Sequence, residues 1–470
     1  MRRFRLLPAL VFGAALIAII LARPDRPLRI GVGAVAHDLC SAVFVSGLEP
    51  GRVFDESLAA RAGLKLIAWA ISYRVDRTQH EVTVQLAGLL EARAAYYGEL
   101  GCILLQGEAP QNLPSGAEFA ALHTDLPPLL PEIAGPEVVV PDDPALKAAL
   151  DHAFAEPREP PLRRTKAVVV VHNGTVIAER YAPGYGVDTP ILGFSLAKSV
   201  MNALAGILVH QGKLQTGERA PIPAWQDPGD ARHLITIEQL MRMTSGLDLD
   251  EEGVGFADPS NQMLYLARDM ADFAEQAQLS APPGTRWSYS SASTHLLARI
   301  IRDRAGGQAL DALGFAEREL FGPLGMRSAV VEVDSTGTMI GSHYILASAR
   351  DWARFGLLYL DGGVIGGKRL LPENWIEFSA RASLGTNYGA GFWTNRSAAA
   401  EAQGRVEGGM PRDAYFASGN LGQRIVILPS QHLVIVRMGY ATGSDNDIGG
   451  LIRLVREVID ATAAQATVQP

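Results

Sequence analysis

A serine and a lysine stand three residues apart at the start of a long apolar run, at Ser195 and Lys198. Lys198 is the only formally charged side chain between Asp188 and Lys213. Residues three apart lie on the same face of a helix, and a hydroxyl beside a desolvated amine is the arrangement that activates a serine nucleophile. The alternative is a capping serine with a lysine that reaches the surface, and Ser-x-x-Lys alone also occurs by chance.

The run that carries this pair predicts a buried helix. Its apolar residues repeat with a helical period and wrap most of the way round the axis, and Gly212 supplies a C-terminal stop. Burying an unpaired lysine is costly, so its isolation favours a chemical role over a structural one.

Two later segments supply candidate partners for Ser195. Tyr289 lies on a predicted loop just before a helix over Thr294–Arg302, where a phenol beside a lysine could accept a proton. Residues 417–423 are glycine-rich and precede a predicted strand, Arg424–Leu428. Such an edge lets a carbonyl approach backbone N–H groups, as an oxyanion hole requires. The alternatives are a packed aromatic side chain and an ordinary glycine-rich turn.

Strand and helix patterns around these segments predict an α+β domain. Residues 167–171 and 175–181 form a hairpin that turns at Asn173-Gly174, and residues 424–428 and 432–438 form another near the end of the chain. Residues 217–330 are rich in helices and loops. We expect an antiparallel sheet built from the first and last segments of this domain, flanked by helices, with a helical subdomain inserted.

The chain divides into four predicted parts. Residues 1–22 form a signal anchor or signal peptide, and residues 28–110 form a small, separate α+β domain with a hairpin at 70–74 and 81–86. Residues 111–163 form a proline-rich linker that includes a short helix over Pro144–Glu156, capped by Asp143. Residues 164–466 form the catalytic domain.

The N-terminal segment predicts export. Three arginines within the first five residues precede an uncharged, mostly apolar run from Leu6 to Ala22. An uncleaved anchor with the bulk of the chain exported fits this pattern slightly better than a cleaved signal peptide. We therefore expect a periplasmic or other extracytoplasmic location, with anchoring to the inner membrane through residues 1–22.

The composition of the chain indicates which kinds of partner and cofactor to expect. The net charge of −8 and the lack of a basic patch argue against binding to nucleic acid. In an oxidising compartment the two cysteines, Cys40 and Cys102, are expected to form a disulfide, with two unrelated buried thiols as the alternative. The ten histidines are scattered without metal-ligand spacing, so we predict no metal and no cofactor.

Several motifs stand in a fixed order along residues 165–465. They are Phe194-Ser-Leu-Ala-Lys-Ser199, Ile235–Leu247, Pro283-Gly-Thr-Arg-Trp-Ser-Tyr-Ser-Ser291, Pro323–Met326, Ala349–Leu360 and Gly422-Gln423. Together they resemble the serine β-lactamase/penicillin-binding-protein superfamily, most closely the class C-like esterases and 6-aminohexanoate-dimer hydrolases. The two-cysteine pattern resembles a segment that precedes this domain in exported bacterial members.

The resemblance implies roles for individual residues. Ser195 would be the acylated nucleophile, with Lys198 and Tyr289 as the proton-transfer pair. Backbone N–H groups of Ser195 and Gln423 would form the oxyanion hole. Substrate would be bound by Ser291, where class C β-lactamases have asparagine, and by Gly422 and Asn420, where they have glycine and a carboxylate-binding lysine.

These observations favour an exported serine hydrolase that acts on a small ester or amide. Losing the lysine at Asn420 removes a charge-assisted hydrogen bond worth roughly 1.5–3 kcal/mol, which counts against efficient turnover of β-lactams. Two alternatives stay open: a D-amino-acid peptidase or weak penicillin-binding protein, and a catalytically silent ligand-binding domain of the same fold. The natural substrate and the oligomeric state are left open.

Overall fold

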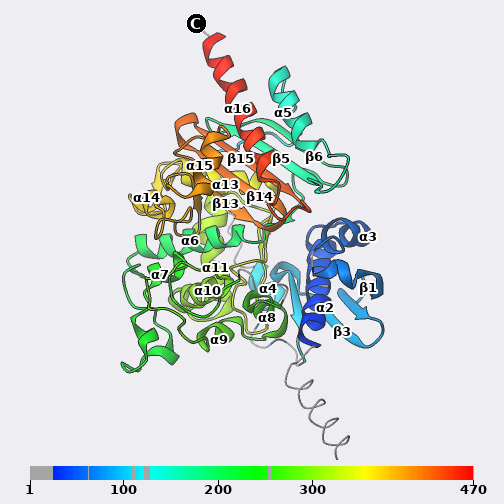
Figure 1. Cartoon of the computed structure of the whole chain (residues 1–470), viewed down its shortest axis with the longest axis vertical. Coiled ribbons are helices and arrows are strands. Elements are labelled where there is room, and N and C mark those ends of the chain that lie inside the picture. The colour runs from blue at the N-terminus through cyan, green and yellow to red at the C-terminus, as the bar shows by residue number, and fades with distance from the viewer. Residues whose placement is uncertain are drawn as a thin grey trace, which may run out of the picture.

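The computed structural model describes residues 25–61, 63–107, 110, 113–120, 127–251 and 257–468. It is an α+β protein, as predicted, in which antiparallel sheets are flanked by helices (Figure 1). The predicted anchor at residues 1–22 lies outside the described residues.

The main sheet joins the two ends of residues 164–466, as the sequence predicts. This stretch, predicted as the catalytic domain, is called the catalytic part of the chain below. Its strand order is β12-β13-β14-β15-β5-β6, and every neighbouring pair is antiparallel. The hairpin turn between β5 and β6 has positive φ at Asn173 and Gly174, which suits a two-residue turn. The strands are β5 Thr165–His172, β6 Thr175–Tyr181, β12 Trp393–Thr394, β13 Tyr415–Gly419, β14 Gln423–Leu428 and β15 Leu433–Gly439.

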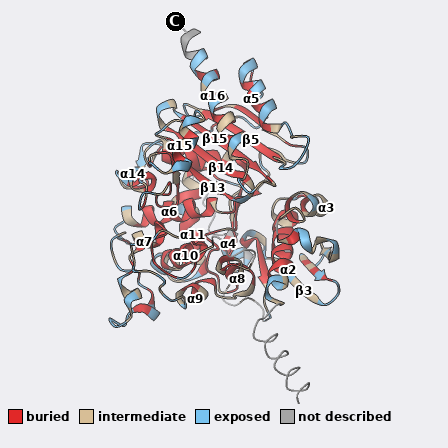
Figure 2. Ribbon diagram, in the orientation of Figure 1, coloured by how far each residue is buried: buried red, intermediate tan, exposed pale blue. Residues whose placement is uncertain are grey.

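Both faces of this sheet are covered, which explains why its strands are apolar along their whole length. On one face, α5 Pro144–Phe154 and α16 Ile448–Val468 enclose a core with residues such as Val170 and Ile435. Asp143 caps α5, as predicted, by accepting from the N–H groups of Ala145 and Leu146. Within the stretch predicted as a linker, α5 is therefore packed onto the sheet (Figure 2).

Helices on the other face carry the candidate chemistry. The long ones are α6 Leu196–His210, α10 Ser291–Ala305 and α13 Ala349–Leu360, which share one large core with the inner face of the sheet. Shorter helices complete this part: α7 Ile237–Met241, α8 Pro259–Leu266, α9 Met270–Glu275, α11 Ala309–Ala316, α12 Gly322–Leu324, α14 Trp375–Ala380 and α15 Ala400–Glu407.

Within residues 217–330, which the sequence predicts to be rich in helices and loops, α8 and α9 are two separate short helices. Asp258 caps α8 and Asp269 caps α9, each accepting from a backbone N–H three residues ahead. A new cap at Asp269 satisfies the first N–H groups of a second helix, so the chain changes direction between Leu266 and Met270.

The N-terminal region has its own antiparallel sheet, packed against α2 Asp25–Cys40 and its continuation Ser41–Val45. The strands are β1 Ile71–Asp76, β2 Glu81–Leu86, β3 Leu90–Tyr96 and β4 Cys102–Leu105. The first two form the predicted hairpin. Apolar residues of this region join the same core cluster as the catalytic part, so the two share a continuous interior.

The helix over Asp25–Val45 is long and apolar enough to cross a membrane. However, 78% of its apolar window is buried within the protein, and a core helix passes the same test of length and composition. Figure 2 shows α2 as buried against the sheet of the N-terminal region.

Cys40 and Cys102 form a disulfide, as predicted, that ties α2 to β4. Beside it, the fully buried Glu332 of the catalytic part is held by the N-terminal region. Its carboxylate accepts from the Cys102 N–H at 2.9 Å and the Ser41 hydroxyl at 2.8 Å, and lies 2.8 Å from His37 Nε2. The disulfide therefore fixes the backbone that holds Glu332.

Replacing both cysteines with alanine is expected to lower the free energy of unfolding by ~2–4 kcal/mol, because the unfolded chain gains freedom in the loop that the disulfide closes. Chemical denaturation of the oxidised protein and the double variant checks this. Reductant should bring the parent protein to the stability of the variant and leave the variant unchanged. Equal stability of the two proteins under oxidising conditions would contradict the prediction.

Candidate active site

The nucleophile candidate sits at the start of α6. Ser195 precedes the first helical residue, and every residue from Leu196 to Leu208 is buried, as the sequence predicts. A short sheet, β7 Ile191–Leu192, β9 Ile345–Ala347 and β8 Val330–Val331, leads into this turn. The Gly193 N–H donates to the Ile345 carbonyl at 2.9 Å, so the turn that presents Ser195 is held against the start of β9.

Lys198 is 3% exposed and points its ammonium at three oxygen atoms. It donates to Ser195 Oγ at 3.0 Å, Ser291 Oγ at 3.0 Å and the Ser342 carbonyl at 3.3 Å. A buried ammonium needs hydrogen-bond partners, and three is the number it can satisfy. The structure thus brings the predicted pair into direct contact, with the lysine buried.

Tyr289 lies on the other side of the lysine, on the loop before α10. The Lys198 ammonium lies 4.7 Å from the centroid of its ring, which makes a cation–π contact. Tyr289 packs within an aromatic cluster, with ring centroids 6.4 Å from Trp287, 5.7 Å from Tyr388 and 5.8 Å from Trp393. The predicted third residue is therefore at the site, and packing sets the position of its ring.

Ser291, predicted to bind substrate, is buried and contacts Lys198. Its backbone N–H donates to the carboxylate of Glu251, a residue that the sequence analysis missed. Desolvation raises the pKa of Glu251, and the Lys198 charge opposes this as the next largest effect. Ser291 thus helps to hold the lysine, and its contact with substrate stays a prediction.

The end of β13 approaches the nucleophile turn closely. A Cβ atom on Gly419 would lie 2.2 Å from the Gly193 carbonyl oxygen, so only glycine allows the strand to come this near. Asn420, the next residue, is exposed. The glycine-rich edge predicted from residues 417–423 is therefore at the site, where Gly419 lies against Gly193 in the turn that presents Ser195.

Two other residues of this edge, Gln423 and Gly422, contribute to pairing and packing within the sheet. Gln423 is a strand residue paired with Gly419, and its buried side chain exchanges two hydrogen bonds with Gly439. Gly422 has φ +91°, and a Cβ there would meet the Arg437 guanidinium at 1.9 Å. Packing around Arg437 thus accounts for the glycine at 422, and no contact places either residue beside Ser195 in the described part of the chain.

A second segment that the sequence analysis missed is Gly341–Tyr344. Its Ser342 carbonyl accepts from Lys198, and the His343 ring packs edge-on against Phe194 with centroids 4.9 Å apart. Desolvation, followed by the charges of Lys198 and Arg61, lowers the pKa of His343 well below 6.5. His343 is therefore neutral at pH 7 beside the nucleophile turn.

His295 on α10 lies close to this group and predicts a pH dependence of stability. Its buried ring contacts the Ser291 carbonyl at 3.2 Å, and burial lowers its pKa to about 4. The unfolded chain binds a proton near pH 6.5 whereas the folded protein does not, so stability is retained above that pH and lost as the pH falls towards 4. The loss from His295 is at most ~1.4 kcal/mol per pH unit.

Denaturation at pH 7.5 and pH 5 checks this expectation. The neutral variant His295→Asn should lose less stability between the two pH values than the parent protein, although His343 still contributes in the same direction. An identical loss in the two proteins would show that His295 is not the group responsible.

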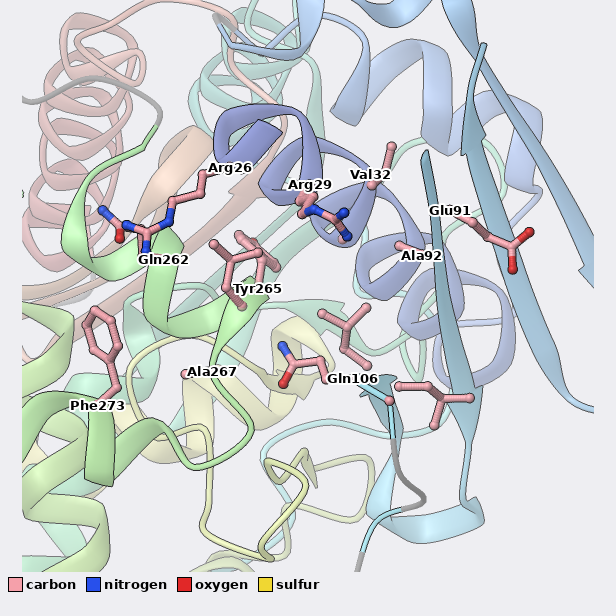
Figure 3. A pocket seen from close by; sticks show the side chains of 15 residues that line it. Arg26, Arg29, Val32, Glu91, Ala92, Gln106, Gln262, Tyr265, Ala267 and Phe273 are labelled. Carbon is pink, nitrogen blue, oxygen red and sulfur yellow. The ribbon is translucent and has the colours of Figure 1, made fainter. Parts of the chain in front are cut away.

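A separate cavity of about 590 Å³ lies between α2, strands β3 and β4, and helices α8 and α9. Figure 3 shows Arg26 and Arg29 on one side of it and Gln262, Tyr265 and Phe273 on the other. None of the predicted site residues lines this cavity. Across the described ranges, no group of three or more His, Cys, Asp or Glu side chains could hold a metal ion.

A match to a known family covers most of the described chain from α5 to α16. The family model described as "Beta-lactamase" matches residues 151–458, about two thirds of the chain. The chain belongs to the beta-lactamase family. This assignment confirms the resemblance drawn from the sequence motifs and makes the protein a member of a family of serine hydrolases.

Individual relatives are more distant. A 6-aminohexanoate-dimer hydrolase from Paenarthrobacter ureafaciens is 28% identical over 226 residues, which cover 45% of this chain and 56% of the relative. A putative 6-aminohexanoate-dimer hydrolase from Bacillus anthracis has a TM-score of 0.55 at 24% identity, covering 78% of this chain and 92% of its own. A family VIII carboxylesterase has a TM-score of 0.52 at 16% identity, covering 70% of this chain and all of its own. The two solved structures support the fold alone.

Proposed function

We propose that the chain is an exported serine hydrolase that cleaves an ester or small amide through an acyl-enzyme on Ser195. One observation carries this proposal: the buried ammonium of Lys198 lies 3.0 Å from Ser195 Oγ. A serine nucleophile needs a proton acceptor within hydrogen-bond reach, and the neutral amine of a lysine can fill that role.

In the proposed reaction, Ser195 Oγ attacks the substrate carbonyl carbon while its proton passes to Lys198, with Tyr289 sharing the transfer. The tetrahedral intermediate then expels the alcohol or amine, which takes a proton from the same pair. Water adds to the acyl-enzyme in the same way, releasing the acid and restoring Ser195. The pair therefore acts as base and then as acid in each half of the reaction.

The developing negative charge on the carbonyl oxygen requires backbone donors. We propose the N–H of Ser195 as one of them, as the sequence resemblance implies. For the second donor, the position of Gly419 against Gly193 favours the N–H of Asn420 over that of Gln423, because Asn420 directly follows Gly419 and is exposed.

The substrate is proposed to be a small ester or amide without an obligatory carboxylate. The relatives include a 6-aminohexanoate-dimer hydrolase and a family VIII carboxylesterase. Residues 417–423 contain no lysine, whereas class C β-lactamases have a carboxylate-binding lysine on this edge, and its absence disfavours β-lactams and peptides that end in D-alanine. Export is part of the proposal, and the Cys40–Cys102 disulfide supports it because disulfides persist in oxidising compartments.

Hydrolysis of p-nitrophenyl acetate, an anilide, a cephalosporin and a D-Ala-D-Ala peptide tests the proposal. The protein should turn over the ester fastest, and Ser195→Ala should abolish that activity. Faster turnover of the D-Ala-D-Ala peptide would favour the peptidase alternative. No turnover of any substrate, with ligand affinity unchanged in Ser195→Ala, would favour a silent binding domain.

A further inference from the structure

A cavity of about 490 Å³ lies between the N-terminal region and the catalytic part of the chain. Residues within and just after η2 Phe54–Leu58, including Ala60 and Arg61, form one wall. The opposite wall includes His343, Asn420 and Leu421. Its volume is in the range of small-molecule binding sites.

Residues that line this cavity pack against the turn that presents Ser195, although Ser195 itself does not line it. The Arg61 guanidinium lies 5.3 Å from the ring centroid of Phe194, the residue before Ser195, and His343 packs against the same ring. On the other side, Asn420 follows Gly419, which touches Gly193. Arg61 and His343, which line the cavity, therefore contact Phe194. Asn420, which also lines it, directly follows the glycine that contacts Gly193.

We propose that this cavity binds one arm of the substrate, that the N-terminal region forms its outer wall, and that the arm is an uncharged group bearing amides. This proposal rests on the proposed function, since it assigns part of the substrate of the same reaction. It gives the N-terminal region a role in specificity, in addition to its packing.

The charges in the lining already have partners. Arg61, the only lysine or arginine that lines the cavity, pairs with Asp38 at 2.7 Å and donates to the Ser57 carbonyl at 3.1 Å. Glu56 pairs with Lys166 and, at 3.1 Å, with Arg52. A carboxylate entering the cavity would lose its hydration without gaining an unpaired cation among these groups.

The amides in the lining favour carbonyl groups. Asn420 Oδ1 and Asn446 Oδ1 both accept from the Leu421 N–H, at 2.9 and 2.8 Å. The Oδ1 atom of each side chain is thus directed at the backbone, which turns its Nδ2 donor away from it. At the exposed Asn420, that donor is available to a carbonyl oxygen of the substrate.

Matched ester substrates test the chemistry of the arm. Two esters are compared that differ only in whether the arm ends in a carboxamide or a carboxylate. One such pair carries the arm on the acyl side of the ester bond, and a second pair carries it on the alcohol side. In one of these two pairs, kcat/KM should be at least tenfold higher for the carboxamide ester than for the carboxylate ester. An equal rate or a preference for the carboxylate on both sides would overturn the assignment.

A neighbouring pair of alanines tests the wall. Ala60 lines the cavity and Ala59 does not, and both are half-buried. In Ala60→Trp, the ratio of kcat/KM for the carboxamide ester to that for p-nitrophenyl acetate should fall at least tenfold. In Ala59→Trp the ratio should stay within about twofold. An unchanged ratio in Ala60→Trp, or an equal fall in both variants, would overturn the proposal.

The melting temperature of each variant is measured first, and Ala60→Leu replaces Ala60→Trp if the larger side chain prevents folding. The two proposals fail separately. If Ser195→Ala still hydrolyses p-nitrophenyl acetate at the parental rate, the proposed function fails. If the parent protein hydrolyses that ester through Ser195 but does not distinguish the two arms, only the assignment of the cavity fails.

Discussion

Lys198→Met is expected to lower kcat/KM for p-nitrophenyl acetate by about 10³-fold, within the range that proton transfer by a positioned side chain contributes. Methionine is similar in length and apolar, so it fills the buried space but cannot accept the proton of Ser195, whose Oγ lies 3.0 Å from the lysine. Steady-state kinetics with the chromogenic ester measures the change.

Stability provides the control for this variant. Lys198→Met leaves three oxygen atoms without this donor, so the melting temperature is measured first and the rates are compared only if the variant is folded at the assay temperature. Lys213→Met changes the exposed lysine that follows α6 and should leave the rate unchanged. If Lys198→Met keeps its activity within tenfold of the parent protein, another group accepts the proton and the mechanism is wrong.

Tyr289→Phe is expected to lower kcat/KM by at least about 10²-fold, because it removes only the phenol oxygen, which we propose shares proton transfer with Lys198. The ring contacts with Trp287, Tyr388 and Trp393 remain, so the melting temperature should change little. Kinetics with p-nitrophenyl acetate measures the effect.

Tyr388→Phe is the matched control because it deletes the same atom from a neighbouring ring of the same aromatic cluster. The Tyr388 hydroxyl is buried and has no hydrogen-bond partner among the described residues, so its loss should leave the rate within a few-fold of the parent protein. A larger effect in Tyr388→Phe than in Tyr289→Phe would show that packing of the cluster controls the rate and that the Tyr289 phenol does not.

Local patterns predicted the parts of the site that depend on one segment at a time. The lone charge of Lys198 in an apolar run indicated a buried helix with a reactive lysine, and the structure confirms the burial and the contact with Ser195. The Asn173-Gly174 turn likewise predicted the β5–β6 hairpin. In both cases the signal is periodicity or turn chemistry, which a short stretch of sequence carries in full.

Contacts between distant segments could not be predicted in this way. Glu251 reaches Ser291, and Ser342 reaches Lys198, from loops that have no regular pattern. Arg61 lies against Phe194 only because the N-terminal region packs on the catalytic part. By contrast, the break between α8 and α9 had a local signal, since Asp258-Pro259 and Asp269 are typical helix starts.

The proposed mechanism depends on Ser195 being the nucleophile. Intact and peptide mass spectrometry after treatment with a fluorophosphonate tests it most directly. The folded protein should gain one adduct, located on Ser195, and both Ser195→Ala and the heat-unfolded protein should gain none. A folded protein that stays unmodified, or that carries its adduct on another residue, would contradict the account.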